Sequence, residues 1–224
     1  MSEILYHKTH PTLEALLKQL HFEEDSDEAD IAQELLEEAV EIACPKTLIN
    51  IIPVKLNEET VTLGEVEITY PYVRKMLVGT DKVAVYISTC GSELEEWSLK
   101  KASDPLEGFI ADAIKLAYLY STNMALREKI KNDVFPDEGH LAALNPGSLE
   151  QWPISEQKNL FKMFGGEDEV KAQIGVTLAE SFLMHPTKSS SGVYFLSEVE
   201  YENCELCPRL TCPNRRAKYK GGSH

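Results

Sequence analysis

The chain alternates between segments with helical periodicity and segments with strand periodicity. Apolar residues three or four positions apart predict helices over residues 12–20, 28–43, 71–78, from 93 onward, 105–131 and 155–164. Apolar and β-branched runs predict strands over residues 47–56, 60–63, 65–68, 82–89, 174–178 and 192–195. The pattern contains no internal repeat and no low-complexity linker. It therefore indicates one domain with mixed α and β structure.

The strongest helix signal begins at Asp104-Pro105, because aspartate caps a helix and proline suits the first helical position. We expect this helix to extend to about residue 131 and to bury a single face. That face is expected to contain Leu106, Phe109, Ile110, Ala113, Ala117, Tyr120 and Met124. The proline- and glycine-rich stretch 132–154 follows, and its length makes it a candidate functional loop.

Charge narrows the range of functions. The chain has 224 residues with 22 Lys and Arg against 37 Asp and Glu, which gives a net charge of −15. Such a surface repels nucleic-acid phosphates and anionic membranes, so neither is an expected partner. No apolar run is long enough for a membrane helix, and the N-terminal residues lack the pattern of a signal peptide. We therefore expect a cytoplasmic protein.

Most charged residues have a simple interpretation as solvated side chains. We assign to solvated faces the carboxylates of Glu37, Glu38, Glu95, Glu96 and Glu180. A basic group near the C-terminus forms either a solvated tail or a dock for an acidic partner; it consists of Arg209, Arg215, Arg216, Lys218 and Lys220. We accordingly divide the chain into a domain of residues 1–200 and a Cys-rich, basic tail of residues 201–224.

Three of the five cysteines, Cys204, Cys207 and Cys212, form a C-x2-C-x4-C pattern. In a reducing compartment such clustering points to a metal rather than to disulfides. Cys90, at the end of a predicted strand, is the preferred fourth ligand, and Cys44 is the next candidate. An iron–sulfur cluster and zinc both accept such ligands. Reduced thiols without a metal are the alternative.

A second pattern lies between residues 178 and 195, where serines precede a glycine in the run Ser189-Ser190-Ser191-Gly192. Hydroxyls and open backbone amides beside a glycine bind polar ligand atoms well. Serine-rich turns are also common without any ligand, and we expect residues 187–191 to form a loop. His185 precedes Pro186 and is interpreted as a surface or packing histidine.

This segment resembles the activation domain of cobalamin-dependent methionine synthase, whose members carry a Thr-Glu-Ser-Phe…Met…Pro…Ser-x-Ser-Gly…Tyr-Phe run. The matching residues are Glu180, Ser181, Phe182, Met184, Pro186, Ser189, Ser191, Gly192, Tyr194 and Phe195, and Ala179 replaces the threonine. Further similar stretches are 61–64, 89–96, 104–107 and 152–157. The resemblance extends over residues 1–200 and is closer to stand-alone members than to the fused domain.

The resemblance implies a single C-shaped α+β domain with a twisted, mainly antiparallel sheet flanked by helices. It implies a role in reactivating a partner corrinoid protein, in which Co(II) is reduced to Co(I) and remethylated by S-adenosylmethionine. The partner, a corrinoid-binding protein or methyltransferase of methionine biosynthesis, would hold the cobalamin. The implied cofactor-facing residues are Glu180, Ser181, Ser189, Ser191, Gly192 and Tyr194, with Gly147 and Trp152 at the rim.

One departure from the family concerns the methyl donor. The family motif Arg-x-x-x-Gly-Tyr keeps its glycine as Gly147, but Ala143 stands at the arginine position and Ser148 at the tyrosine position. An arginine there would bind a carboxylate with two charged hydrogen bonds. Its loss argues against binding of S-adenosylmethionine. An iron–sulfur tail would then deliver an electron, with an electron donor as a further partner. The alternative is a non-catalytic module that caps the cobalamin domain of a methyltransferase, with a structural metal.

Overall fold

The computed structural model describes residues 2–136, 139–207, 210–211, 215 and 217–220. Its α-helices are α1 (Leu13–Leu20), α2 (Asp27–Ile42), α3 (Pro71–Met76), α4 (Ser92–Lys101), α5 (Pro105–Lys129), α6 (Gln157–Lys162) and α7 (Glu167–Ile174). Its strands are β1 (Glu3–Tyr6), β2 (Lys46–Leu56), β3 (Val61–Leu63), β4 (Val66–Ile68), β5 (Lys82–Thr89), β6 (His140–Leu144), β7 (Thr177–Leu178), β8 (Met184–His185) and β9 (Ser189–Ser197). The predicted α+β class is confirmed.

The main sheet is open and its strand pairs are antiparallel. Its order is β4-β3-β2-β5-β9-β6, and β1 pairs with the first residues of β2, opposite β5. The last long strand of the chain, β9, therefore lies between β5 and the edge strand β6. Strands β7 and β8 form a separate two-stranded sheet. This arrangement places the serine-rich start of β9 beside the end of β5.

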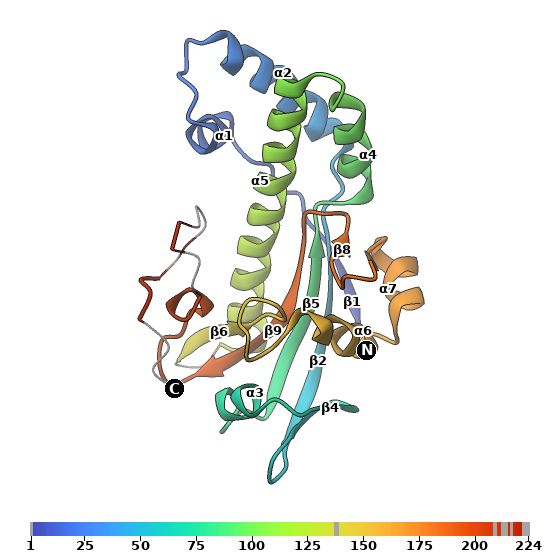
Figure 1. Ribbon diagram of the computed structural model, residues 1–224, viewed down its shortest axis with the longest axis vertical. Coiled ribbons are helices and arrows are strands. Elements are labelled where there is room, and N and C mark those ends of the chain that lie inside the picture. Colours follow the sequence, from blue (N-terminus) through green and yellow to red (C-terminus); the bar gives the residue numbers. More distant parts are fainter. Residues whose placement is uncertain (1, 137–138, 208–209, 212–214, 216, 221–224) are drawn as a thin grey trace.

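Hydrophobic residues form three clusters, and α5 contacts two of them. One cluster lies in the helical end of the molecule, between α1, α2, α4 and the first half of α5. A second covers the sheet face that packs against α3, α6 and α7. The third covers the opposite face and includes Leu126 from the last turn of α5 and Tyr194 from β9. Figure 1 shows α5 running from the helical end down along the sheet.

The start of α5 agrees with its sequence signal, but its predicted buried face is wrong at three positions. The carboxylate of Asp104 accepts hydrogen bonds from the backbone N–H groups of Leu106 and Glu107, at 2.8 and 3.0 Å. In contrast, Phe109, Tyr120 and Met124 are each more than half exposed. The first half of the helix packs against one hydrophobic cluster and its last turn packs against another. Its buried residues therefore do not form one continuous apolar stripe.

Several predicted boundaries also need correction. Strand β6 lies inside the stretch 132–154 that was expected to be a loop, and β9 begins at Ser189 instead of after residue 191. The segment 174–178 is mostly the end of α7 and a two-residue strand. Strand β6 gains its conformation from pairing with the second half of β9, and the serine-rich start of β9 gains its own from pairing with the end of β5. Local sequence does not encode either pairing.

A buried ion pair joins the helical end to the strand region, and it corrects the assignment of Glu95 to a solvated face. The ammonium of Lys115 on α5 lies 2.9 Å from the carboxylate of Glu95 on α4, and their side chains are 6% and 7% exposed. The hydroxyl of Thr187 also donates to Glu95, at 3.2 Å. A charge removed from water this completely needs such partners. The pair therefore fixes α4, α5 and the segment before β9 relative to one another.

None of the helices in the described part of the chain is both long enough and apolar enough to span a membrane.

Candidate functional site

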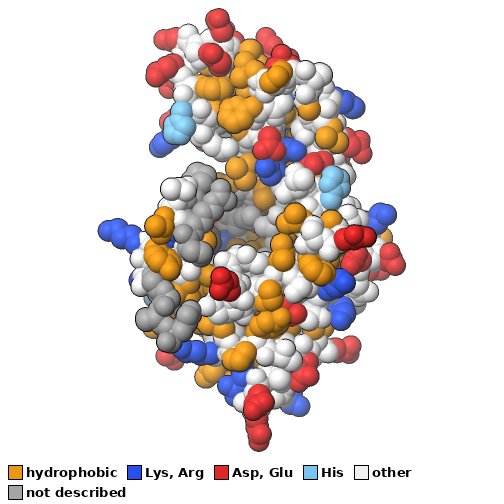
Figure 2. Space-filling view, in the orientation of Figure 1, with side chains coloured by type: hydrophobic (Ala, Val, Ile, Leu, Met, Phe, Trp, Pro, Cys, Tyr) orange, Lys and Arg blue, Asp and Glu red, His pale blue; other side chains and the backbone are white. Residues whose placement is uncertain are grey.

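A groove of about 410 Å³ lies between α5, the start of β9 and the segment after β6. We refer to it as the groove. Its lining comprises Tyr86, Leu116, Leu119, Tyr120, Asn123, Met124, Arg127, Ala143, Asn145, Pro146, Ser148, Gln157, Met184, Ser189, Ser190, Ser191, Tyr194 and Cys204. In the space-filling view the surface is hollowed between the helical end and the sheet (Figure 2). The groove is therefore built from elements far apart in sequence.

Two stacked tyrosines form part of the groove lining. The rings of Tyr86 on β5 and Tyr194 on β9 have centroids 4.8 Å apart and an interplanar angle of 24°. The two strands are neighbours in the sheet, and both rings lie on the face that packs toward α5. Both are almost fully buried. They form a rigid aromatic wall of the groove, most of which is covered by neighbouring residues.

The serines at the start of β9 make hydrogen bonds with three different parts of the structure. Ser189 donates to the carbonyl of Pro186 at 2.8 Å, and Ser190 donates to the amide of Asn123 on α5 at 3.0 Å. Ser191 donates to the amide oxygen of Gln157 at 2.8 Å. These contacts hold α5 and α6 against β9. The serines therefore shape the groove as well as offering polar atoms to it.

Asn145, directly after β6, connects the groove to residues 201–207, which follow β9 and which we call the C-terminal segment. Its amide nitrogen donates to the hydroxyl of Tyr86 at 2.8 Å and to the carbonyl of Ser191 at 2.7 Å. Its amide oxygen accepts from Asn203 at 2.8 Å. Asn203 in turn accepts from Tyr201 at 2.9 Å. One side chain thus links two groove-lining strands to the segment that follows β9.

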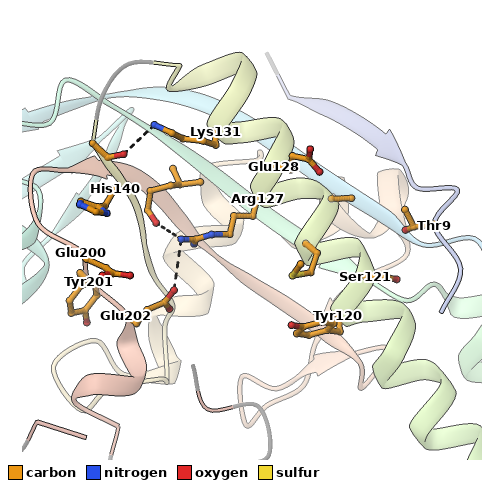
Figure 3. A pocket seen from close by; sticks show the side chains of 14 residues that line it. Thr9, Tyr120, Ser121, Arg127, Glu128, Lys131, His140, Glu200, Tyr201 and Glu202 are labelled. Atoms are coloured by element: carbon orange, nitrogen blue, oxygen red, sulfur yellow. Dashed lines mark hydrogen bonds and ion pairs between the residues drawn. The ribbon is translucent and has the colours of Figure 1, made fainter. Parts of the chain in front are cut away.

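Arg127 is a cation of α5 that no sequence pattern marks as a site residue. It lines the groove and also a second cavity of about 760 Å³, which we call the side cavity. The guanidinium Nη2 donates to the carbonyl of Leu141 on β6 at 2.7 Å. It also lies 3.8 Å from a carboxylate oxygen of Glu202 (Figure 3). Tyr120 and Met124, expected in the core, line both cavities as well.

The groove brings together some of the residues that the resemblance implies. Ser189, Ser191 and Tyr194 line it, whereas Glu180 and Ser181 are exposed in the connection between β7 and β8 and are not among its lining residues.

Three further residues that the resemblance implies, Gly192, Gly147 and Trp152, have roles in the fold. A Cβ at Gly192 would collide with the Leu144 carbonyl and the Asn145 side chain, so a glycine lets β9 and β6 pack closely there. Gly147 has φ +85° in the turn after β6 and lines a different cavity. Trp152 is 2% exposed and belongs to the core.

The predicted metal ligands are not assembled in the described residues. Cys90 is fully buried in the cluster of the helical end, and burial raises the pKa of its thiol to about 12. A metal ligand must be a thiolate, which this environment disfavours. Cys204 and Cys207 lie in the C-terminal segment and Cys212 lies outside the described residues. Within the described ranges, no group of three or more His, Cys, Asp or Glu side chains is placed to hold a metal ion.

Comparison with known proteins supports the fold. A scan against family models and a search of curated protein sequences return no match. Among solved structures, the chain shares its mixed α+β architecture with a domain of the methionine synthase class. That structure is described as the MetH reactivation domain bound to AdoHcy. It aligns with a TM-score of 0.64 and 15% identity, over 90% of this chain and 80% of that one. The fold implied by the resemblance is confirmed.

Proposed function

We propose that this protein is a reactivation module for a partner corrinoid protein, within a cobalamin-dependent methyltransferase system. The observation that carries the proposal is the position of the β9 motif. Ser189, Ser191 and Tyr194, which match the family run, line one groove in a chain with the fold of the MetH reactivation domain. The partner would hold the cobalamin, and this chain would cover its reactive face. Support for the reduction of Co(II) to Co(I) and for remethylation is part of the same proposal.

The groove also suits a small ligand of the S-adenosyl type, such as the AdoHcy bound by the structural neighbour. The stacked Tyr86 and Tyr194 form a rigid wall of the groove, while Asn123 and Ser190 contribute polar atoms to its lining. Ala143 and Ser148 line the groove without the guanidinium and phenol that the family motif would supply. A donor bound here would be oriented by this chain and would provide the methyl group for remethylation.

An electron-delivering cluster in the tail receives no support from the described residues, so we derive no step through one. The proposal takes an external electron donor as the reductant. This chain's own contribution is to bind the partner and to exclude water from the reacting face. Metal analysis of anaerobically purified protein tests the tail directly, and iron with sulfide would restore the electron-delivery hypothesis.

The test measures association with the cobalamin-binding domain of a methionine synthase, loaded with cob(II)alamin. The variant Met124→Glu places a charge in the groove at a residue that is 56% exposed, so we expect the fold to survive. The matched control Leu99→Glu makes the same change at a 66% exposed residue of α4 outside the groove. We expect Met124→Glu to weaken association at least about tenfold and Leu99→Glu to leave it unchanged.

Three outcomes discriminate between the functions. Association together with faster reduction of cob(II)alamin by a chemical reductant supports the reactivation module. Association with no change in the reduction rate supports the alternative, a non-catalytic module that caps the cobalamin domain. Failure of the unmodified protein to associate with the corrinoid domain contradicts both.

A further inference from the structure

Arg127 is the only Lys or Arg among the described residues that line the groove. Figure 3 shows its side chain among the residues that line the side cavity, and the same side chain also lines the groove. Its side chain is 34% exposed, which leaves the guanidinium accessible from both cavities. A cation in this position gives an otherwise aromatic and neutral polar groove a preference for an anionic group.

The guanidinium has unused hydrogen-bonding capacity. Nη2 donates to the Leu141 carbonyl at 2.7 Å, and this bond holds the planar group over β6. The structure shows no hydrogen bond from Nε or Nη1 to any residue in the described part of the chain. An arginine can bind a carboxylate through two parallel N–H···O bonds. Such charge-assisted hydrogen bonds are stronger than hydrogen bonds between neutral groups. The guanidinium of Arg127 is therefore oriented by one hydrogen bond and retains donors for a bound carboxylate.

A carboxylate of the same chain, that of Glu202, already lies beside this guanidinium. The Oε1 atom of Glu202 is 3.8 Å from Nη2, which is within ion-pair range but beyond hydrogen-bond distance. Glu202 belongs to the C-terminal segment and adjoins Asn203, which is 6% exposed and bonded to Asn145. The anchored asparagine keeps the glutamate close to Arg127. The contact is therefore of the kind that a better-fitting carboxylate can replace.

Arg127 also supplies a charge beside the position where the resemblance implies one. Ala143 lines the same groove, and Leu141, whose carbonyl Arg127 contacts, lies two residues earlier on the same face of β6. A guanidinium carried by the helix therefore lies over β6, in contact with the residue two positions before Ala143. The absence of arginine at position 143 does not leave this end of the groove without a cation.

We propose that Arg127 binds the carboxylate of a small amino-acid-containing ligand in the groove, and that Glu202 occupies this position until the ligand arrives. The inference rests on the proposed function for its ligand class, the S-adenosyl amino acids. Arg127 is here a specificity-determining residue: it distinguishes ligands with a free carboxylate from those without one. Binding exchanges an intramolecular ion pair for an intermolecular one, and Glu202 is its internal competitor.

The test compares two ligands that differ in the amino-acid moiety. AdoHcy carries the carboxylate, and 5′-methylthioadenosine retains the nucleoside and the thioether but lacks the amino-acid group. Both affinities are measured by isothermal titration calorimetry with the full chain. We expect the unmodified protein to prefer AdoHcy at least about tenfold, and Arg127→Met to lose this preference while keeping its affinity for 5′-methylthioadenosine. The retained affinity shows that the groove of the variant is folded.

A second pair of variants tests the competitor. Glu202→Gln removes the internal carboxylate, and we expect it to strengthen AdoHcy binding severalfold without changing 5′-methylthioadenosine binding. The matched control Glu200→Gln alters an exposed glutamate two residues earlier that lines the same side cavity, and it should change neither affinity.

The inference is overturned if the unmodified protein binds neither ligand, if it binds both equally, or if Arg127→Met keeps the preference. Each of these results leaves the proposed function open to its own test, because association with the corrinoid domain is measured without either ligand. A chain that associates with the corrinoid domain but shows no carboxylate preference retains the proposed function and loses this role for Arg127.

Discussion

Two residues far apart in sequence, Glu95 and Lys115, form the most deeply buried ion pair in the described structure. Around them lie Thr187, which donates to Glu95, and Asp112, which is 3.6 Å from Lys115 and 2.8 Å from Lys188. A pair of this kind contributes little net stability compared with apolar packing, but it is costly to break on one side only. We therefore expect that removing either Glu95 or Lys115 alone lowers the free energy of unfolding strongly.

We predict that Lys115→Met destabilises the fold by about 3–5 kcal/mol, because it leaves the Glu95 carboxylate buried without its cation. The control Lys101→Met removes the cation of a partly exposed pair with Glu38, at 2.7 Å, and should cost less than about 1 kcal/mol. Equilibrium unfolding in urea measures both. Equal losses for the two variants would show that burial of the Glu95–Lys115 pair has no special cost.

At the scale of single residues, the resemblance predicted Ser189, Ser191 and Tyr194 as site residues, and these line the groove, but it pointed to none of Arg127, Tyr86 or Asn145. The three predicted residues share one run and one strand, so a linear motif contains them. Arg127 and Tyr86 come from α5 and β5 and reach the groove only through tertiary packing. No local pattern marks such residues. The same limit explains Cys90, whose position after a strand suggested a ligand although it is buried among helices.

At the scale of elements, the sequence predicted those whose signals are local. Helix α5 has its aspartate cap and N-terminal proline, and the strands β2 and β5 have long apolar runs. Helix α7 was missed because it is short and mostly polar, and β6 was missed because it lies between prolines and glycines. The strand conformation of β6 is fixed by pairing with β9, which lies some fifty residues later.

The C-terminal segment is attached to the rest of the molecule through side-chain contacts that single substitutions can test. Asn203 and Tyr201 connect it to Asn145 and Tyr72 through hydrogen bonds of 2.8 and 2.9 Å. Burial raises the pKa of both Tyr72 and Tyr201 above the ordinary tyrosine value, so their hydroxyls remain able to donate well above neutral pH. The attachment therefore combines neutral hydrogen bonds with the ion pair between Glu202 and Arg127.

We predict that Asn203→Ala weakens the attachment of residues 201–207 by about 1–3 kcal/mol, because the amide of Asn145 loses its buried partner. Hydrogen exchange followed by mass spectrometry should show faster exchange in this segment and little change in β2 and β5. The variant Glu198→Ala, at an exposed position just before the segment, is the control. Faster exchange across the whole sheet would instead show that Asn203 supports the global fold.

At the scale of the whole molecule, charge is distributed unevenly. Residues 14–41 contain eleven Asp and Glu and one Lys. They form α1, α2 and the connection between them, and Figure 2 shows acidic side chains gathered over that end. Several of these side chains lie within one or two turns of one another. Their mutual repulsion opposes folding and is reduced by added salt.

We predict that the melting temperature rises by a few degrees between about 10 and 150 mM sodium chloride, as the Debye length falls from about 30 to about 8 Å. The double variant Glu24→Lys/Glu28→Lys should raise the melting temperature at low salt and reduce its dependence on salt. Differential scanning fluorimetry measures both effects. A melting temperature that falls with added salt would show that attractive pairs, such as Lys101–Glu38, outweigh the repulsion.

Helix α5 acts as a lever because one rigid element is held in two separate cores. At 1.5 Å per residue, its 25 residues span about 37 Å. Ile110 and Ile114 seat one end among the helices, and Leu126 seats the other against the sheet. A tilt of about 5° about one end displaces the other by about 3 Å, comparable to the thickness of an aromatic ring. Because α5 forms one wall of the groove, its anchoring in both cores holds the groove at a defined width.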